Sequence, residues 1–267
     1  MKERKYLVPL DFSEFSFTIF RFACAFAKIT NAKLTVIHAY QLRSRAGMFM
    51  SVEERIANDC QIEFDKLLER NKENLEGLDI DVRILKGDAE RTIPDYAGRR
   101  NFDMIIMGTK GSSGVRGAFM GSVASNVLER STTPIFLIPV SYELKKVEKV
   151  LFGMADFDCE PEVISALFAF VDAFDPEIEL LHFGKYDVPE NVNEILDSVF
   201  TPGRWKLTIK ETDKNIDRKI EEYAEETDAN LICLVRKKKG FWVNLFGKSI
   251  TRSTSYHTKT PMLIMME

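Results

Sequence analysis

The sequence has few residues that could support metal or disulfide chemistry. It contains 4 cysteines, none of them in a C-x-x-C pair, and 3 histidines that lack the spacing of metal ligands. The cysteines lie mostly among apolar neighbours, as Cys24 and Cys233 do, which is typical of reduced residues in a core. We therefore expect no metal site.

Long apolar runs and an excess of positive charge are also missing. No run of about eighteen apolar residues is present, and Met1 is followed closely by a short strand-like segment, so we expect neither a membrane span nor a secretion signal. The 37 Lys and Arg residues against 41 Asp and Glu give a net charge of -4, too little positive charge to attract nucleic acid or an anionic membrane. We expect a cytoplasmic protein that binds neither.

The chain repeats itself. The segment from Lys5 to Phe12 recurs from residue 149 to 157 with one extra residue, and an offset of 144 also joins Leu34 to Ile178. Later the offset falls to 127, from Asp103 to Asn230, so the second copy is 17 residues shorter in its middle. The first copy has an extra polar segment from residue 42 to about 54, which we predict to be a flap over a ligand. The repeats predict two domains, residues 1–142 and 147–267.

Strand-like and helix-like segments alternate in each copy. In the first, we predict strands over residues 5–10, 33–39, 81–86, 102–107 and 134–140, and helices over 13–30, 51–74, 89–99 and 122–130, the first of them capped by Ser13. Strands separated by helices pair in parallel through right-handed crossovers, with helices on both faces of the sheet. The sequence therefore predicts an α/β protein of two tandem, doubly wound, five-stranded domains, whose ligands bind at the carboxyl ends of the strands.

A glycine-rich loop follows the fourth predicted strand. Five glycines fall within the fourteen residues from Gly108 to Gly121, directly before a predicted helix. Glycine allows the main chain to approach a ligand closely, and the amides of the loop and of the helix start can then converge on an anion. Phosphate is the ligand that this arrangement favours, with Ser122 as a candidate helix cap whose hydroxyl can reach a phosphate oxygen.

The glycine spacing resembles a known motif. Gly108, Gly111, Gly121 and Ser122 form the pattern G-x2-G-x9-G-S/T of the ATP-binding branch of the universal stress protein family, and residues 7–14 resemble the opening strand of that family. The resemblance covers residues 3–140 and, more weakly, 147–267. It implies the fold of the adenine nucleotide alpha hydrolases with strand order 3-2-1-4-5, and a stress-response role.

The resemblance also implies a site for ATP, with or without Mg²⁺, in the first domain only. The residues of that site would be Pro9, Leu10, Asp11, Ala39, Met107, Gly108, Lys110, Gly111, Gly121, Ser122 and Val123. Asp11 would bond the ribose or adenine side and the main chain of Ala39 would bond adenine. The glycine loop, from Gly108 to Val123, would hold the phosphates, with charge added by Lys110 and Arg116.

Some of these residues have a structural alternative. Asp11 could simply cap the helix that starts near Ser13, because strand-end aspartates often do so. His38 and His182 lie within apolar strands and favour a core hydrogen bond over chemistry. The phenylalanines of the first helix, including Phe17 and Phe20, favour packing against the sheet.

The second copy has lost the motif. The positions of its three motif glycines are taken by Val235, Lys238 and Lys248, whose side chains would obstruct a phosphate held by main-chain amides. We therefore expect the second domain to be unable to hold ATP in the same manner.

Three functions remain open from the sequence. The leading hypothesis is a regulatory protein in which bound ATP orders the loop and the flap and so alters partner contacts. The first alternative is slow ATP hydrolysis or autophosphorylation on Ser122, Ser112 or Ser113, and the second is a nucleotide-free scaffold. The last strand of each half is apolar, over residues 134–140 and 261–266. Such edge strands tend to pair, so we predict that the two halves pair within the chain. A homodimer of two chains is a further possibility.

Overall fold

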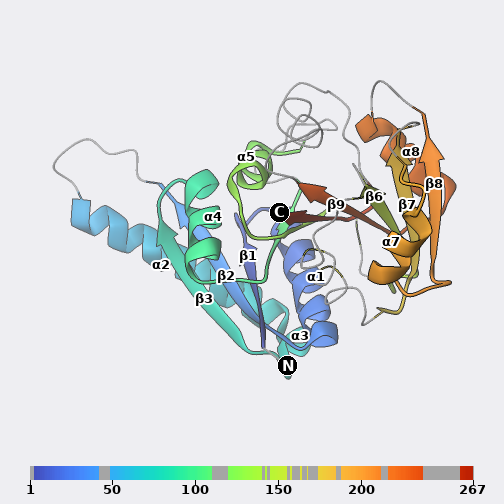
Figure 1. Cartoon of the computed structure of the whole chain (residues 1–267). Helices are drawn as coiled ribbons and strands as arrows, with labels where there is room; N and C mark the ends of the chain where they lie inside the picture. Colours follow the sequence, from blue (N-terminus) through green and yellow to red (C-terminus); the bar gives the residue numbers. More distant parts are fainter. Residues whose placement is uncertain are drawn as a thin grey trace. The chain divides into compact units, whose positions relative to one another are not determined.

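The computed structural model describes residues 3–41, 49–109, 120–139, 142, 145–154, 157, 163, 167, 174–184, 188–211, 216–236 and 259–266. These residues form two compact units (Figure 1). The first unit holds the described residues up to 142 and the second holds those from 145 onward. Each unit is described separately below.

The first unit is built on a parallel sheet. Its strands are β1 (Arg4–Pro9), β2 (Ala32–Tyr40), β3 (Ile80–Lys86), β4 (Met104–Gly108) and β5 (Ile135–Ile138). They pair in the order β3-β2-β1-β4-β5, and every pair within this order is parallel. The predicted α/β fold and strand order are thereby confirmed for this unit.

Helices flank this sheet. They are α1 (Glu14–Thr30), α2 (Phe49–Arg70), α3 (Lys72–Leu75), α4 (Ala89–Arg99) and α5 (Ser122–Arg130). Helix α1 packs on β1, β2 and β4, helix α2 packs on β3, and α4 packs on β2 and on α5. Figure 1 shows α4 in front of the strands that it covers.

Two predicted segments of the first unit differ from the structure. The single helix predicted over residues 51–74 is wrong, because it is divided at Asn71, whose buried side chain donates from Nδ2 to the carbonyl oxygen of Leu67 at 2.7 Å. An asparagine that bonds the main chain in this way competes with the helix. Of the predicted flap, residues 42–48 lie outside the described residues, and residues 49–54 form the start of helix α2.

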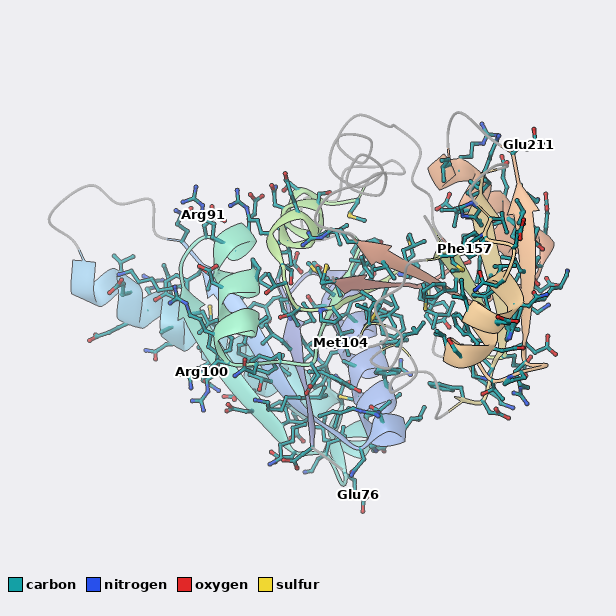
Figure 2. The ribbon with its side chains drawn as sticks, viewed as in Figure 1. Glu76, Arg91, Arg100, Met104, Phe157 and Glu211 are labelled. Carbon is teal, nitrogen blue, oxygen red and sulfur yellow. The ribbon has the colours of Figure 1, made fainter. Side chains whose placement is uncertain are left out.

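The core of the first unit lies around its central strands. Tyr6, Leu7 and Val8 of β1 are fully buried, as are Met104, Ile105 and Ile106 of β4. A strand covered by helices on both faces has no polar side, which explains these continuous apolar runs. Figure 2 shows Met104 in this interior, whereas Glu76, Arg91 and Arg100 lie at the surface.

Three of the predicted core phenylalanines of α1 belong to the same core, namely Phe20, Phe22 and Phe26. The ring of Phe26 stacks on Tyr6 at 5.6 Å between centroids and meets the ring of Phe136 edge-on at 5.3 Å. Phe17 is only half-buried, beneath the guanidinium of Arg70 at 5.3 Å. The aromatic residues of α1 that are buried thus fix the helix to the sheet.

The second unit repeats the same order of strands. Its strands are β6 (Lys149–Met154), β7 (Glu177–Phe183), β8 (Trp205–Lys210), β9 (Leu231–Arg236) and β10 (Met262–Met266), paired in parallel in the order β8-β7-β6-β9-β10. Helices α7 (Val192–Val199) and α8 (Ile216–Glu226) are described with them.

The two units also share strand register. The pair Pro9 and Ile37 recurs as Gly153 and Leu181, at the offset of 144 found in the sequence. The pair Ile105 and Ile135 recurs as Ile232 and Met262, at the offset of 127. Residues at these offsets therefore occupy equivalent places in the two units.

The described cysteines agree with the sequence analysis. Cys24, Cys60 and Cys233 are free thiols and all are buried, whereas Cys159 lies outside the described residues. No helix in the part of the chain that the structure describes has the length and apolar composition needed to cross a membrane.

Candidate functional site

A cavity of about 200 Å³ lies at the carboxyl ends of β1, β2 and β4 in the first unit. The predicted site residues that line it are Pro9, Leu10, Asp11, Ala39, Met107, Gly108, Gly121, Ser122 and Val123. Lys110, Gly111 and Arg116 lie outside the described residues, as do Lys238 and Lys248 of the second copy. Every predicted site residue that the structure describes therefore borders one cavity, at the edge of the sheet where such folds bind ligands.

The turn after β1 forms one wall of the cavity. The amide of Leu10 donates to the carbonyl oxygen of Ile37 at 2.8 Å, which holds the end of β1 against β2. Phe12 then adopts a left-handed backbone conformation with φ 57°, a conformation that is uncommon for a bulky residue. Local strain of this kind persists where surrounding contacts fix it, and it concentrates at functional sites.

Asp11 organises the start of helix α1. Its Oδ1 accepts hydrogen bonds from the amide of Ser13 at 3.1 Å and from the hydroxyl of Ser16 at 3.0 Å. Ser13 occupies the N-cap position, as predicted, and its side chain makes no capping hydrogen bond. Asp11 is therefore not the N-cap of α1, although its carboxylate orders the turn before the helix, and the same residue borders the cavity.

His38 braces this turn from β2. Its Nδ1 lies 2.8 Å from the carbonyl oxygen of Leu10, and its ring stacks on Phe12 at 4.5 Å, while Phe12 meets Phe64 edge-on at 4.9 Å. Because a carbonyl oxygen only accepts, Nδ1 carries the hydrogen, and in the neutral ring Nε2 is then an acceptor. The predicted core hydrogen bond is confirmed, but the sequence analysis did not identify His38 as a residue that lines the cavity.

The ends of the glycine loop are joined by main-chain hydrogen bonds. Gly108 is the last residue of β4, and the next amide, that of Thr109, donates to the carbonyl oxygen of Ile138 on β5 at 3.0 Å. The amide of Gly121 donates to the carbonyl oxygen of Thr109 at 2.7 Å. Gly108 and Gly121, which are far apart in the sequence motif, are thus held at the same rim of the cavity.

Helix α5 points its first turn at the cavity. Its N-cap is Gly121 and its first residue is Ser122, so the prediction that Ser122 caps the helix is wrong. The hydrogen bond from Gly121 to Thr109 places Gly121 just before the helix, and the first helical bond runs from the amide of Ser125 to the carbonyl oxygen of Gly121 at 3.0 Å.

The start of α5 is suited to an anion. The amides of the first helical residues have no acceptor within a helix and carry partial positive charge. Here those residues are Ser122, Val123 and Ala124, and all three border the cavity. Such an arrangement binds phosphate or carboxylate oxygens. Among the described residues that line the cavity, Asp11 is the only one with a formal charge at neutral pH.

The other end of the cavity is narrow-walled and apolar. Ala39 at the end of β2 and Ala89 at the start of α4 present small side chains, and Ile93 of α4 adds an apolar surface. Helix α4 is fixed there by Asp88, whose Oδ1 accepts from the amide of Glu90 at 2.9 Å. A flat apolar ring flanked by main-chain polar groups is the kind of ligand that fits such walls. Nothing in the sequence motif pointed to Ala89 or Ile93.

Comparison with known proteins agrees with the fold and the motif. The model of the universal stress protein family matches residues 3–139, and the chain belongs to this family. Universal stress protein MJ0531 of Methanocaldococcus jannaschii is 26% identical over 138 residues, which are 51% of this chain and 81% of that protein. Universal stress protein YxiE of Bacillus subtilis is 27% identical over 144 residues, which are 50% of this chain and 97% of that protein.

A solved structure resembles the whole chain. A universal stress protein from Archaeoglobus fulgidus gives a TM-score of 0.78 at 18% sequence identity, and the match covers 100% of this chain and 99% of that one. At this level of identity the likeness concerns the fold. It extends over both units, whereas the family model matches the first.

Proposed function

We propose that this protein is a regulatory, stress-response protein of the cytoplasm that binds ATP in its first unit. One observation carries the proposal. Three segments border the same cavity, namely the turn at Asp11, the end of β2 at Ala39 and the first turn of α5 at Gly121. These are the three places to which the family motif assigns ribose, adenine and phosphates.

The two ends of the cavity suit the two ends of ATP. The apolar walls at Ala39 and Ala89 would hold adenine, and the main chain of Ala39 would bond its edge. Asp11 would bond the ribose, using the carboxylate that already orders the turn. The amides at the start of α5 would bind the β- and γ-phosphates, because a helix start favours negative charge. By sequence, Gly111 and Lys110 belong to the same loop and would complete the phosphate end.

The described residues favour binding over efficient hydrolysis. Phosphoryl transfer to water needs a residue that orients the nucleophile and, with Mg²⁺, carboxylates to hold the ion. Among the described residues, no group of three or more His, Cys, Asp and Glu side chains could hold a metal ion, and Oδ1 of Asp11 already accepts two hydrogen bonds. Bound ATP would then act by ordering the loop, a change that partners can read.

Titration of the intact chain with ATP tests this function. We expect heat of binding with one ATP per chain, weaker binding of GTP, and ATP recovered unhydrolysed after prolonged incubation. Absence of binding at millimolar ATP would overturn the proposal. Rapid release of ADP or a phosphorylated Ser122 would instead favour the enzymatic alternative. The predicted pairing of the two halves and the homodimer stay predictions.

A further inference from the structure

The two units can be compared residue by residue at the site. In the first unit His38 pairs with Ile84, and in the second His182 pairs with Ile209. Gly108 pairs with Ile138, and Val235 pairs with Met265. Helices α4 and α8, which follow the third strand of each unit, both have 11 residues. The small residues that line the cavity therefore have defined counterparts in the second unit.

All three counterparts are larger. At the end of β7, Phe183 stands where β2 has Ala39, and Ile216 opens α8 where Ala89 opens α4. Val235 stands in β9 where β4 has Gly108. Ile216 is 6% exposed and Val235 is 8% exposed, and Phe183 is half-buried. Equivalent backbone positions direct their side chains alike, so the added carbons project into the volume that is open in the first unit.

The histidine near the end of the second strand of each unit is buried to a different extent in the two units. Nδ1 of His182 lies 3.2 Å from the carbonyl oxygen of Met154, and its ring lies 4.8 Å from that of Phe157, labelled in Figure 2. His38 makes the same contacts with Leu10 and Phe12. His38 is nevertheless half-buried and lines a cavity, whereas His182 is 1% exposed.

The main chain also closes over His182. A β-carbon built on Gly184 would lie 2.7 Å from Nε2 of His182, so the backbone at this position sits directly against the ring edge. Nε2 is buried and has no hydrogen-bond partner among the described residues. The counterpart of Gly184 in the first unit is Tyr40, which follows Ala39 at the end of the strand.

We propose that the second unit is closed to nucleotides at its base end by its own side chains, and that Phe183 and Ile216 occupy the space that adenine takes in the first unit. This inference rests on the proposed function of the first unit. It locates the block at the apolar end of the site, separate from the loss of the glycines. Restoring the glycine loop of the second copy would therefore not restore binding, and each chain holds one nucleotide.

Introducing the larger side chains of the second unit into the first unit tests where nucleotide binding is obstructed. The variant Ala39→Phe in the intact chain should weaken ATP and adenosine by the same factor, roughly 10- to 100-fold, because overpacking at the base end affects both. The control Ile62→Phe adds an aromatic ring at an exposed position of α2 that does not line the cavity, and it should bind like the wild type. Ala89→Ile on the opposite wall should reproduce the loss, which covers the case in which Ala39→Phe fails to fold. Wild-type affinity in a folded Ala39→Phe or Ala89→Ile variant would overturn the proposal.

Opening the second unit gives the reciprocal test. The double variant Phe183→Ala with Ile216→Ala should bind two adenosine molecules per chain in equilibrium dialysis, where the wild type binds one. A count that stays at one in the folded double variant would overturn the proposal. Failure of the wild type to bind ATP or adenosine would instead refute the proposed function of the first unit, so the two failures are distinguishable.

Discussion

The amide of Gly121 donates a hydrogen bond to the carbonyl oxygen of Thr109 at 2.7 Å, and this bond joins the end of β4 to the start of α5. Thr109 is itself anchored to Ile138 on β5. The two anchored ends place Gly108 and the first amides of α5 at one rim of the cavity. The phosphate end of the proposed site is therefore fixed by main-chain bonds of the folded unit.

Enlarging Gly121 should remove ATP binding without unfolding the chain. Gly121 has φ -62°, which any residue adopts, so Gly121→Val is not strained at the backbone. Gly121 borders the cavity directly before the amides that are to hold phosphate, so an added side chain would take up space at this end. We expect ATP affinity to fall by at least about tenfold, the equivalent of roughly 1.4 kcal/mol, with adenosine binding much less affected. Calorimetric titration measures both ligands, and equal losses for ATP and adenosine would contradict the assignment.

A second glycine serves as the matched control. Gly98 lies within helix α4, and a β-carbon there would meet only Oγ1 of Thr132, at an ordinary contact distance of 3.6 Å. Gly98→Ala should therefore stabilise the protein by about 0.5–1 kcal/mol, because alanine loses less conformational entropy than glycine in a helix. ATP affinity should not change. A lower midpoint of urea unfolding for this variant would be the opposite of the expected result.

The two roles of Asp11 can be separated by two substitutions. Asp11→Ala removes the acceptor for the Ser13 amide and the Ser16 hydroxyl and should cost about 1 kcal/mol of unfolding free energy. Asp11→Asn keeps an oxygen at the Oδ1 position and should retain most of that stability. Urea unfolding measures the difference. Equal stability of the alanine variant and the wild type would show that these hydrogen bonds are not needed for the turn.

Binding by the same two variants tests the ribose contact. Asp11→Ala should weaken ATP and adenosine alike, because both carry the ribose that Asp11 is proposed to bond. Asp11→Asn should fall between the alanine variant and the wild type. Unchanged affinity of Asp11→Ala in the folded state would leave Asp11 a purely structural role.

The buried thiols should be unreactive in the native chain. Burial raises the pKa of the Cys24 thiol to about 12, although Lys28 acts in the opposite direction, and burial alone raises the pKa of Cys233. The thiolate is the reactive form, so alkylation by iodoacetamide at pH 8 should be slow until the protein is denatured. Mass spectrometry of digested samples measures this at each cysteine. Rapid native labelling of Cys24 or Cys233 would contradict their placement in the core.

The same shifts predict how stability depends on pH. A thiol whose pKa is raised in the folded state is protonated there at a pH at which the unfolded chain has already lost the proton. This contribution to stability is therefore complete below the ordinary thiol value of about 9 and is lost as pH rises toward about 12. Replacing Cys24 by alanine should remove part of the alkaline loss, which unfolding curves at several pH values would measure.

The sequence was sufficient for the parts of the fold that depend on repeating patterns. Buried strands such as the one around Ile105 are continuous apolar runs, and the offsets of 144 and 127 reappear as identical strand registers. The motif from Gly108 to Ser122 likewise identified residues that the fold brings to one cavity, because parallel strands all end at the same edge of the sheet.

The parts that the sequence could not supply depend on contacts between distant segments. The boundary between α2 and α3 at Asn71 arises from a hydrogen bond between the side chain of Asn71 and the main chain. The helical spacing of apolar residues in the sequence does not reveal such a bond. The cap at Gly121 follows from its bond to Thr109, which only loop closure creates. Ala89 reaches the site because α4 packs on β2, and the closure over His182 depends on the backbone at Gly184.

A crystal structure of the intact chain grown with ATP would show where the nucleotide binds. We expect one nucleotide per chain, with adenine between Ala39 and Ala89, ribose at Asp11 and the phosphates on the amides from Gly121 to Val123, and no nucleotide against Phe183. Electron density for ATP outside this cavity, or its absence at saturating concentration, would contradict it.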